Sequence, residues 1–282
     1  MAEKTATMTF ESVMSDLKAG NYAPSYLLMG EEAYYIDQIA DFIAEHAIKP
    51  EERDFNQQIV FGADVTGAQV ADMARSYPVM AERQVIIVKE AQNIKNWDQL
   101  ERYLEKPAKT TVLVVCYKNG TIDGRKKILT RFKNAGVVFE SKKKRDYELP
   151  PFIEAYLKKR TKVTIENKAA QMLADHIGAD LSRLTGEIDK LLLSLEEGDT
   201  RITPQMVEKR IGISKDFNAF ELRSAIAAKD VVKANLILKY FDSNPKTGGA
   251  FALIPVIFSY FQNLMLDRKS TRLNSSHCQS SR

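Results

Sequence analysis

The residues with the clearest chemical potential follow a short apolar run, at the place where an α/β protein would hold a nucleotide. Tyr26–Met29 leads into Gly30, Glu31 and Glu32. A phosphate-binding loop needs several glycines whose backbone N–H groups wrap the phosphates, a lysine for the β/γ charge and a Ser or Thr for Mg²⁺. This turn has one glycine and two carboxylates that would repel a triphosphate, and GxxxxGK[ST] occurs nowhere in the chain. The sequence therefore predicts a degenerate phosphate loop and no ATP hydrolysis.

A second candidate site follows the apolar run Gln84–Val88, which leads into Lys89 and Glu90. In an ATPase this place carries an acidic pair that holds Mg²⁺ and polarises the attacking water. Only Glu90 is present, so we expect a degenerate acidic-pair site; the alternative is an ordinary ion pair at a strand end. The chain has three histidines and two cysteines, without the spacing of a nucleophile or a metal site. We expect no catalytic residue, no cofactor and no metal.

These candidate sites require a sheet to position them. From Tyr26 to about Glu140, short runs rich in Val, Ile and Leu have the length of strands buried on both faces. The runs are Tyr26–Met29, Gln58–Phe61, Gln84–Val88, Thr111–Cys116 and Val137–Glu140. Helical patterns separate them, at Ile36–Ile43, Val65–Tyr77, Trp97–Leu104 and Arg125–Phe132. This βαβα rhythm predicts a mainly parallel sheet with helices on its faces.

Strand patterns stop after the turn signal Leu149-Pro150-Pro151, and the remaining chain has helical spacing. Thr203-Pro204 is typical of an N-cap with proline at the first helical position, and Gly212 is a plausible helix stop. The fold class is therefore α/β plus all-α. We expect a sheet domain over residues 1–145, a small all-helical domain over 146–212 and a further helical domain over 213–266. The uncharged stretch Ala250–Leu266 is shorter than a membrane span and predicts a core or interface helix.

The last sixteen residues differ in character from the rest of the chain. Asp267–His277 reads DRKSTRLNSSH, which looks like one reading frame of a sequencing-adapter oligonucleotide. We expect residues 267–282 to be a non-native tail and the natural protein to continue differently after about Leu266. The tail holds four basic residues against one acid, so the formal net charge of +4 leaves residues 1–266 almost neutral. Any nucleic-acid contact must therefore be local.

No basic stretch followed by an apolar one marks the N-terminus, so no signal peptide is expected. The cysteine usage gives no disulfide framework. Both features favour a cytoplasmic location without a membrane partner.

Four stretches in register resemble the delta subunit family of the bacterial DNA polymerase III clamp loader. They are YLLMGEEAYYIDQI, YPVMAERQVIIVKEAQNI, GADLSRLTGEIDKLLL and FNAFELRSAIAAKDVVKANLILKYF. The resemblance implies an AAA+-like first domain without a working ATP site, a helical lid domain and a helical collar domain, here incomplete. It implies a subunit that binds the sliding clamp and opens the ring for loading on primed DNA. Its partners would be delta prime and the ATP-binding motor subunits, through the collar, and primer-template DNA.

The family contacts the clamp through an apolar wedge between the second helix and third strand of the first domain. The matching positions are Pro78, Val79 and Met80, although relatives often carry bulkier aromatic residues there. A proline stiffens such a loop, and Met adapts to an irregular pocket. The alternative is that Val79 and Met80 pack under the edge of the sheet.

DNA phosphates are expected to contact the basic run Lys142, Lys143, Lys144 and Arg145, unless that run is simply a solvated linker. The family is part of the DNA-directed DNA polymerase holoenzyme, a nucleotidyltransferase, although we expect no catalysis from this chain itself. Two other functions remain open: an active AAA+ ATPase motor subunit and a stand-alone nucleic-acid-binding module. The missing phosphate loop counts against the first, and the nearly neutral charge of residues 1–266 counts against the second.

Overall fold

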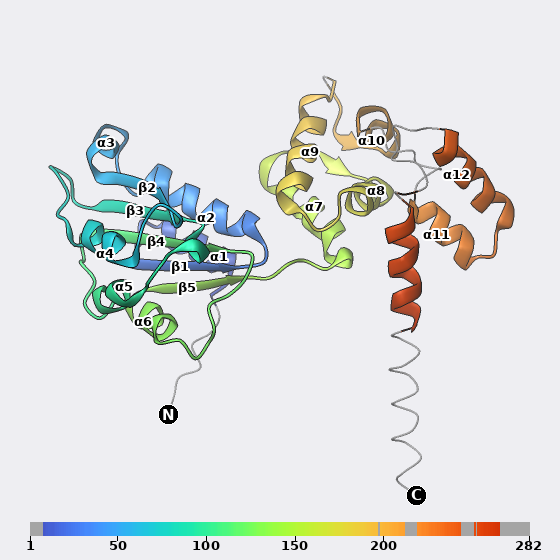
Figure 1. The fold of residues 1–282 in the computed structure, drawn as a ribbon. Helices are drawn as coiled ribbons and strands as arrows, with labels where there is room; N and C mark the ends of the chain where they lie inside the picture. The colour runs from blue at the N-terminus through green and yellow to red at the C-terminus, as the bar shows by residue number, and fades with distance from the viewer. Residues whose placement is uncertain (1–7, 197, 212–218, 244–250, 252, 266–282) are drawn as a thin grey trace, which may run out of the picture. The chain divides into compact units, whose positions relative to one another are not determined.

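A five-stranded parallel sheet forms the centre of the first part of the computed structural model, which describes residues 8–196, 198–211, 219–243, 251 and 253–265. The strands are β1 (Ser25–Gly30), β2 (Gln57–Phe61), β3 (Gln84–Lys89), β4 (Thr111–Lys118) and β5 (Val137–Ser141). They lie in the order β2-β3-β4-β1-β5, and every neighbouring pair is parallel (Figure 1). All five predicted strands and their parallel arrangement are confirmed.

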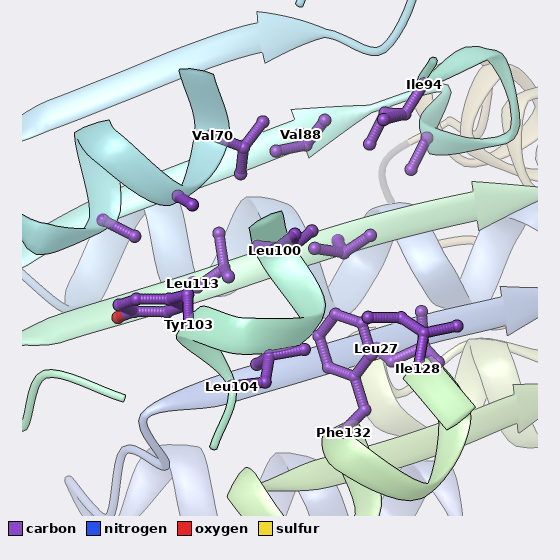
Figure 2. Close-up of a cluster of buried hydrophobic side chains, with 14 of the residues drawn as sticks. Leu27, Val70, Val88, Ile94, Leu100, Tyr103, Leu104, Leu113, Ile128 and Phe132 are labelled. Atoms are coloured by element: carbon purple, nitrogen blue, oxygen red, sulfur yellow. The ribbon is translucent and has the colours of Figure 1, made fainter. Parts of the chain in front are cut away.

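Helices cover both faces of this sheet. The helices of this part are α1 (Phe10–Lys18), α2 (Ala33–His46), α3 (Arg53–Asn56), α4 (Gly67–Arg75), α5 (Asp98–Tyr103) and α6 (Lys127–Ala135). Side chains alternate along each strand, so Leu27 and Met29 join the core under α4, α5 and α6, whereas Tyr26 and Leu28 join the core under α1 and α2. Figure 2 shows the first of these cores, where Phe132 packs beside Leu27. The helices α1 and α3 were not predicted.

The connections between strands give the two ends of the sheet different structures. The crossover through α2 carries the chain from β1 to the edge strand β2, and the crossover through α6 carries it from β4 to β5 on the other side of β1. These two helices lie on opposite faces. The carboxyl ends of β1 and β4 therefore meet at a topological switch point, where open α/β sheets usually bind ligands. The amino ends of β2 and β3 carry α3 and the loop that follows α4.

The remaining described residues are mostly helical. They include α7 (Leu149–Arg160), α8 (Asn167–Ile177), α9 (Leu181–Leu193), α10 (Pro204–Ile211), α11 (Ala219–Ala227), α12 (Val231–Ser243) and a helix over residues 254–265. Contacts divide the chain into two compact units, Met1–Arg145 with Ala179–Ser182, and Asp146–Gly178 with Arg183–Arg282. The first unit holds the sheet, and the second holds most of these helices.

Two details of the second unit correct the sequence reading. The turn predicted at Leu149-Pro150-Pro151 is the first turn of α7, because proline is tolerated where the backbone N–H has no helical partner. The expected all-helical domain also contains a pair of two-residue parallel strands, β6 (Thr164–Ile165) and β7 (Arg201–Ile202). Such strands are too short for an alternating pattern to be recognised in the sequence.

The predicted cap of α10 is confirmed, since the Thr203 hydroxyl accepts a hydrogen bond from the Met206 backbone N–H at 3.4 Å. The expected stop at Gly212 and the tail at 267–282 lie outside the described residues, and the domain boundary at 212 stays a prediction. Among the helices of the described ranges, none has the length and apolar character needed to cross a membrane.

A half-buried carboxylate on α8 predicts a pH-dependent stability of the second unit. Burial raises the pKa of Asp175 from 3.8 to about 6, although its hydrogen bond from Gln171 at 2.6 Å acts in the opposite direction. Because the pKa of Asp175 is higher in the folded than in the unfolded protein, its ionised form destabilises the folded state at pH values above 6. This destabilisation disappears below pH 4, where the carboxyl is protonated in both states.

We therefore expect Asp175→Asn to raise the free energy of unfolding at pH 7.5 by about 1–2 kcal/mol, after allowance for partial solvent exposure. The gain should shrink as the pH falls through 6 and vanish near pH 4. Thermal melts of both proteins across this pH range measure it. Glu154→Gln removes an exposed carboxylate of the same unit and is the control. An Asp175→Asn gain that is equal at pH 4 and 7.5 would contradict the assignment.

Candidate functional site

The turn between β1 and α2 is too short to wrap a phosphate. Only Glu31 and Glu32 separate the strand from the helix. Gly30 has a φ of +137°, and a Cβ there would lie 1.9 Å from the Ser141 carbonyl oxygen of β5. The Glu31 backbone N–H donates to the same oxygen at 3.0 Å. The glycine is therefore required by close packing against β5, and one backbone N–H that a phosphate would need already has a partner.

The N-terminus of α2 is occupied by a carboxylate of the chain itself. Glu32 is buried, and its side chain accepts a hydrogen bond from the Tyr34 backbone N–H at 3.0 Å. The pKa of Glu32 is raised, chiefly by burial and also by Asp180, although this hydrogen bond and the charges of Lys143 and Lys144 act in the opposite direction. A carboxyl group of the chain itself thus already occupies the helix N-terminus, where an anion would bind. A triphosphate would have to displace it and accept its repulsion.

An internal ion network fills the switch point at the carboxyl ends of the strands. The Lys118 ammonium at the end of β4 lies 2.7 Å from the Asp37 carboxylate of α2 and 3.9 Å from that of Glu90. Gln92 links the two strand ends, because its amide donates to Glu90 and accepts from the Lys118 backbone N–H. Glu90 is therefore part of this network, and its sequence neighbour Lys89 pairs with Asp41 instead, at 3.6 Å.

Lys118 is only 16% exposed, so its ammonium group is largely shielded from solvent between its carboxylate partners. Across the described ranges, no cluster of three or more His, Cys, Asp or Glu side chains is arranged to hold a metal ion. Sequence reasoning missed Lys118 and Asp37, which are 81 residues apart and share no motif. Only the pairing of β1 with β4 brings them together.

The basic run follows β5 and lies near the degenerate phosphate loop. Lys144 stands over the ring of Tyr35 on α2, 5.9 Å from its centroid, and Lys142, Lys143 and Arg145 are exposed. The structure thus brings together two predicted sites, because Lys143 and Lys144 are close enough to act on Glu32. A role for the run in partly neutralising Glu32 does not exclude a DNA contact, which stays a prediction.

The predicted wedge lies at the opposite, amino end of the sheet, in the loop between α4 and β3. Val79 is 54% exposed and Met80 is 97% exposed, with Pro78 half-buried between them and Tyr77. The alternative that Val79 and Met80 pack under the sheet edge is wrong. Contiguous exposed apolar side chains mark interaction sites more often than single ones, and here Tyr77, Val79 and Met80 are exposed in one loop.

Both ends of this loop are fastened to the sheet. The buried Gln84 amide, at the start of β3, donates to the backbone carbonyls of Met73 and Ser76 at the end of α4 and to the Thr111 hydroxyl. Arg83 stacks on the ring of Tyr22 at 5.0 Å. The apolar residues therefore project from a loop whose base is held in place by these hydrogen bonds and this ring contact.

Comparison with known proteins finds similarity to one family. The family model described as DNA polymerase III, delta subunit, matches residues 26–142. The curated DNA polymerase III subunit delta of Bacillus subtilis is 30% identical over 230 residues, which are 78% of this chain and 65% of that protein. The chain thus spans less than two thirds of that relative's length.

A solved structure of the Bacillus subtilis DNA clamp loader delta protein is 26% identical and superposes with a TM-score of 0.63, covering 88% of this chain and 75% of that one. The RuvB Holliday junction branch migration motor of Thermotoga maritima is 20% identical over 77% of this chain, with a TM-score of 0.44. The delta match is the one that bears on function. The predicted combination of a parallel-sheet α/β domain with helical regions is confirmed.

The ion network at the switch point predicts a measurable coupling. We expect Lys118→Met to destabilise the protein by roughly 1–3 kcal/mol, because it leaves two carboxylates without their shared cation. Asp37→Asn in the same chain should recover part of that loss. The four proteins of this double-mutant cycle, compared by urea denaturation, give the interaction energy. Strictly additive effects would show that the contact contributes nothing.

Proposed function

We propose that the chain belongs to the family of DNA polymerase III delta subunits, to which it is similar, and that it binds the sliding clamp and opens the ring without hydrolysing ATP itself. The observation that carries this proposal is the placement of Val79 and Met80. Both side chains are exposed to solvent on a loop whose base is held by side-chain contacts. The sequence resemblance assigns them to the wedge positions of the family.

A non-hydrolysing role is supported by the chemistry of the switch point. Glu32 supplies the negative charge at the N-terminus of α2, and Lys118 supplies the positive charge beside Glu90. Both places are therefore satisfied internally, at the positions where an ATPase would hold its phosphates and metal. The energy for clamp loading would come from ATP bound by the motor subunits of the complex.

Clamp opening would follow from selective binding. A closed ring that opens transiently is trapped when the wedge binds the open form better than the closed one. Burial of each apolar side chain contributes roughly 1.5–3 kcal/mol before the costs of ordering and association. A few kcal/mol of differential binding are enough to shift such an equilibrium by orders of magnitude.

The other partners belong to the same proposal. The helical region from residue 213 onwards would join delta prime and the motor subunits in a collar, and many of its described apolar side chains are exposed, among them Val231, Val232 and Phe258. Primer-template DNA would contact Lys142–Arg145 through phosphates. The protein would act in the cytoplasm as part of the polymerase holoenzyme, whose nucleotidyltransferase activity resides in other chains.

The wedge is tested by titrating the sliding clamp from the same genome with the protein and its Val79→Ser/Met80→Ser variant. We expect the Kd to rise by ~10–100-fold, because two apolar side chains no longer fill the clamp pocket. Tyr147→Ser/Leu193→Ser removes two other exposed apolar side chains, 68% and 88% accessible, and should leave the Kd unchanged. Equal affinity of the wedge variant and the unmodified protein would refute the assignment.

The second part of the proposal concerns nucleotide. The isolated protein should release no radiolabelled phosphate from ATP above background, and calorimetry should detect no ATP binding at millimolar concentration. Release should begin only when the motor subunits are added. Turnover by the isolated chain would instead support the active ATPase alternative.

A further inference from the structure

A buried asparagine joins the wedge to a different part of the fold. Asn56 ends α3, immediately before the edge strand β2, and is 2% exposed. Its side-chain oxygen accepts a hydrogen bond from the Val79 backbone N–H at 2.6 Å, and its amide nitrogen donates to the Val79 carbonyl at 3.0 Å. The same nitrogen donates to the Glu52 carbonyl at 2.9 Å. Both polar backbone atoms of Val79 are therefore held by one side chain that lies 23 residues away.

This contact reaches the middle of the loop. Gln84 and Arg83 fasten its base, whereas Asn56 fixes the residue that carries the first wedge side chain. The pairing resembles one rung of a sheet ladder, with an amide side chain in place of the second strand. It can form because β2 and β3 are paired, which places the residues before each strand at the same end of the sheet.

The next residue has an unfavourable backbone conformation. Met80 has a φ of +53°, in the left-handed region, which is unfavourable for a residue with a Cβ. Its side chain is 97% exposed, so packing against the described part of the chain offsets little of this backbone strain. Strain at an exposed apolar residue persists only where the surroundings impose it, and Asn56 supplies that constraint one residue earlier.

We propose that Asn56 is a positioning residue that holds the wedge in its clamp-binding conformation before the clamp arrives. This inference rests on the proposed function, because it assigns Val79 and Met80 to the clamp. A loop that is already ordered avoids the entropy cost of ordering on binding, and affinity falls in proportion when the competent conformation is only partly populated. Asn56 would thus set clamp affinity without touching the clamp.

The first test needs no substitution. Because Val79 donates its N–H to a buried acceptor, its amide hydrogen should exchange at least ~10-fold more slowly than that of an unstructured peptide, although the residue lies in an exposed loop. Hydrogen exchange measured by NMR on the full chain gives the rate. Exchange at the unstructured rate would overturn the proposal.

The second test uses two substitutions. Asn56→Ala removes every hydrogen bond of the side chain, and Asn56→Asp keeps the shape and the acceptor but places an anion against two carbonyl oxygens. We expect both to speed Val79 exchange and to raise the clamp Kd by ~10-fold or more. In the Val79→Ser/Met80→Ser background, Asn56→Ala should cause little further loss, since there is no wedge left to position. A merely structural role would lower affinity equally in both backgrounds.

Asn96→Ala is the matched control. Asn96 is another asparagine of the sheet unit whose side chain bonds to backbone, accepting from the Asp98 N–H at 2.9 Å at the start of α5. Its loss should lower thermal stability and leave the clamp Kd unchanged. If the wedge variant loses clamp binding while both Asn56 variants bind normally, the positioning role is wrong and the clamp-binding function stands. If the wedge variant also binds normally, the proposed function itself is wrong.

Discussion

The burial of the parallel sheet on both faces is the constraint on which the rest of the structure depends. Leu27 and Leu28 are neighbours in β1, yet they enter two different, predominantly apolar cores. The charged and exposed side chains discussed above lie instead at the two ends of the sheet. This molecule uses the ends for different purposes, with an internal ion network at the carboxyl ends of the strands and an exposed apolar loop at the amino ends.

At the carboxyl end of the sheet, charged side chains of the chain interact with one another. The strand order still creates a switch point beside β1. However, Glu32 provides the anion at the helix N-terminus and Lys118 provides the cation between Asp37 and Glu90. Charged side chains of the chain itself therefore occupy the carboxyl end of the sheet. The proposed clamp-binding loop lies at the other end.

The amino end depends on a small number of polar contacts. Gln84 closes the base of the loop and Asn56 holds its centre, so Val79 and Met80 need no apolar packing of their own. The buried amides of Asn56 and Gln84 hold the loop backbone, whereas the exposed side chains of Val79 and Met80 determine the chemistry of its surface.

Much of this protein followed from its sequence alone, because the relevant signals are local. Apolar runs such as Gln84–Val88 predicted the strands, and Thr203-Pro204 predicted a helix start. Proline at the first turn of α7 and the two-residue strands β6 and β7 escaped the same reasoning. The cause is that the local pattern is either ambiguous or too short there.

The long-range pairs were decided only by the tertiary structure. Lys118 meets Asp37 across 81 residues, and Asn56 meets Val79 across 23. No spacing rule links such residues, since they become neighbours only when β1 pairs with β4 and β2 with β3. The sequence by itself determined which residues are apolar, charged or stiff. The sheet determined which of them meet, because strand order sets which strand ends are adjacent. The pairing of β2 with β3 brings Asn56 to Val79, and Met80, the next residue, is exposed to solvent.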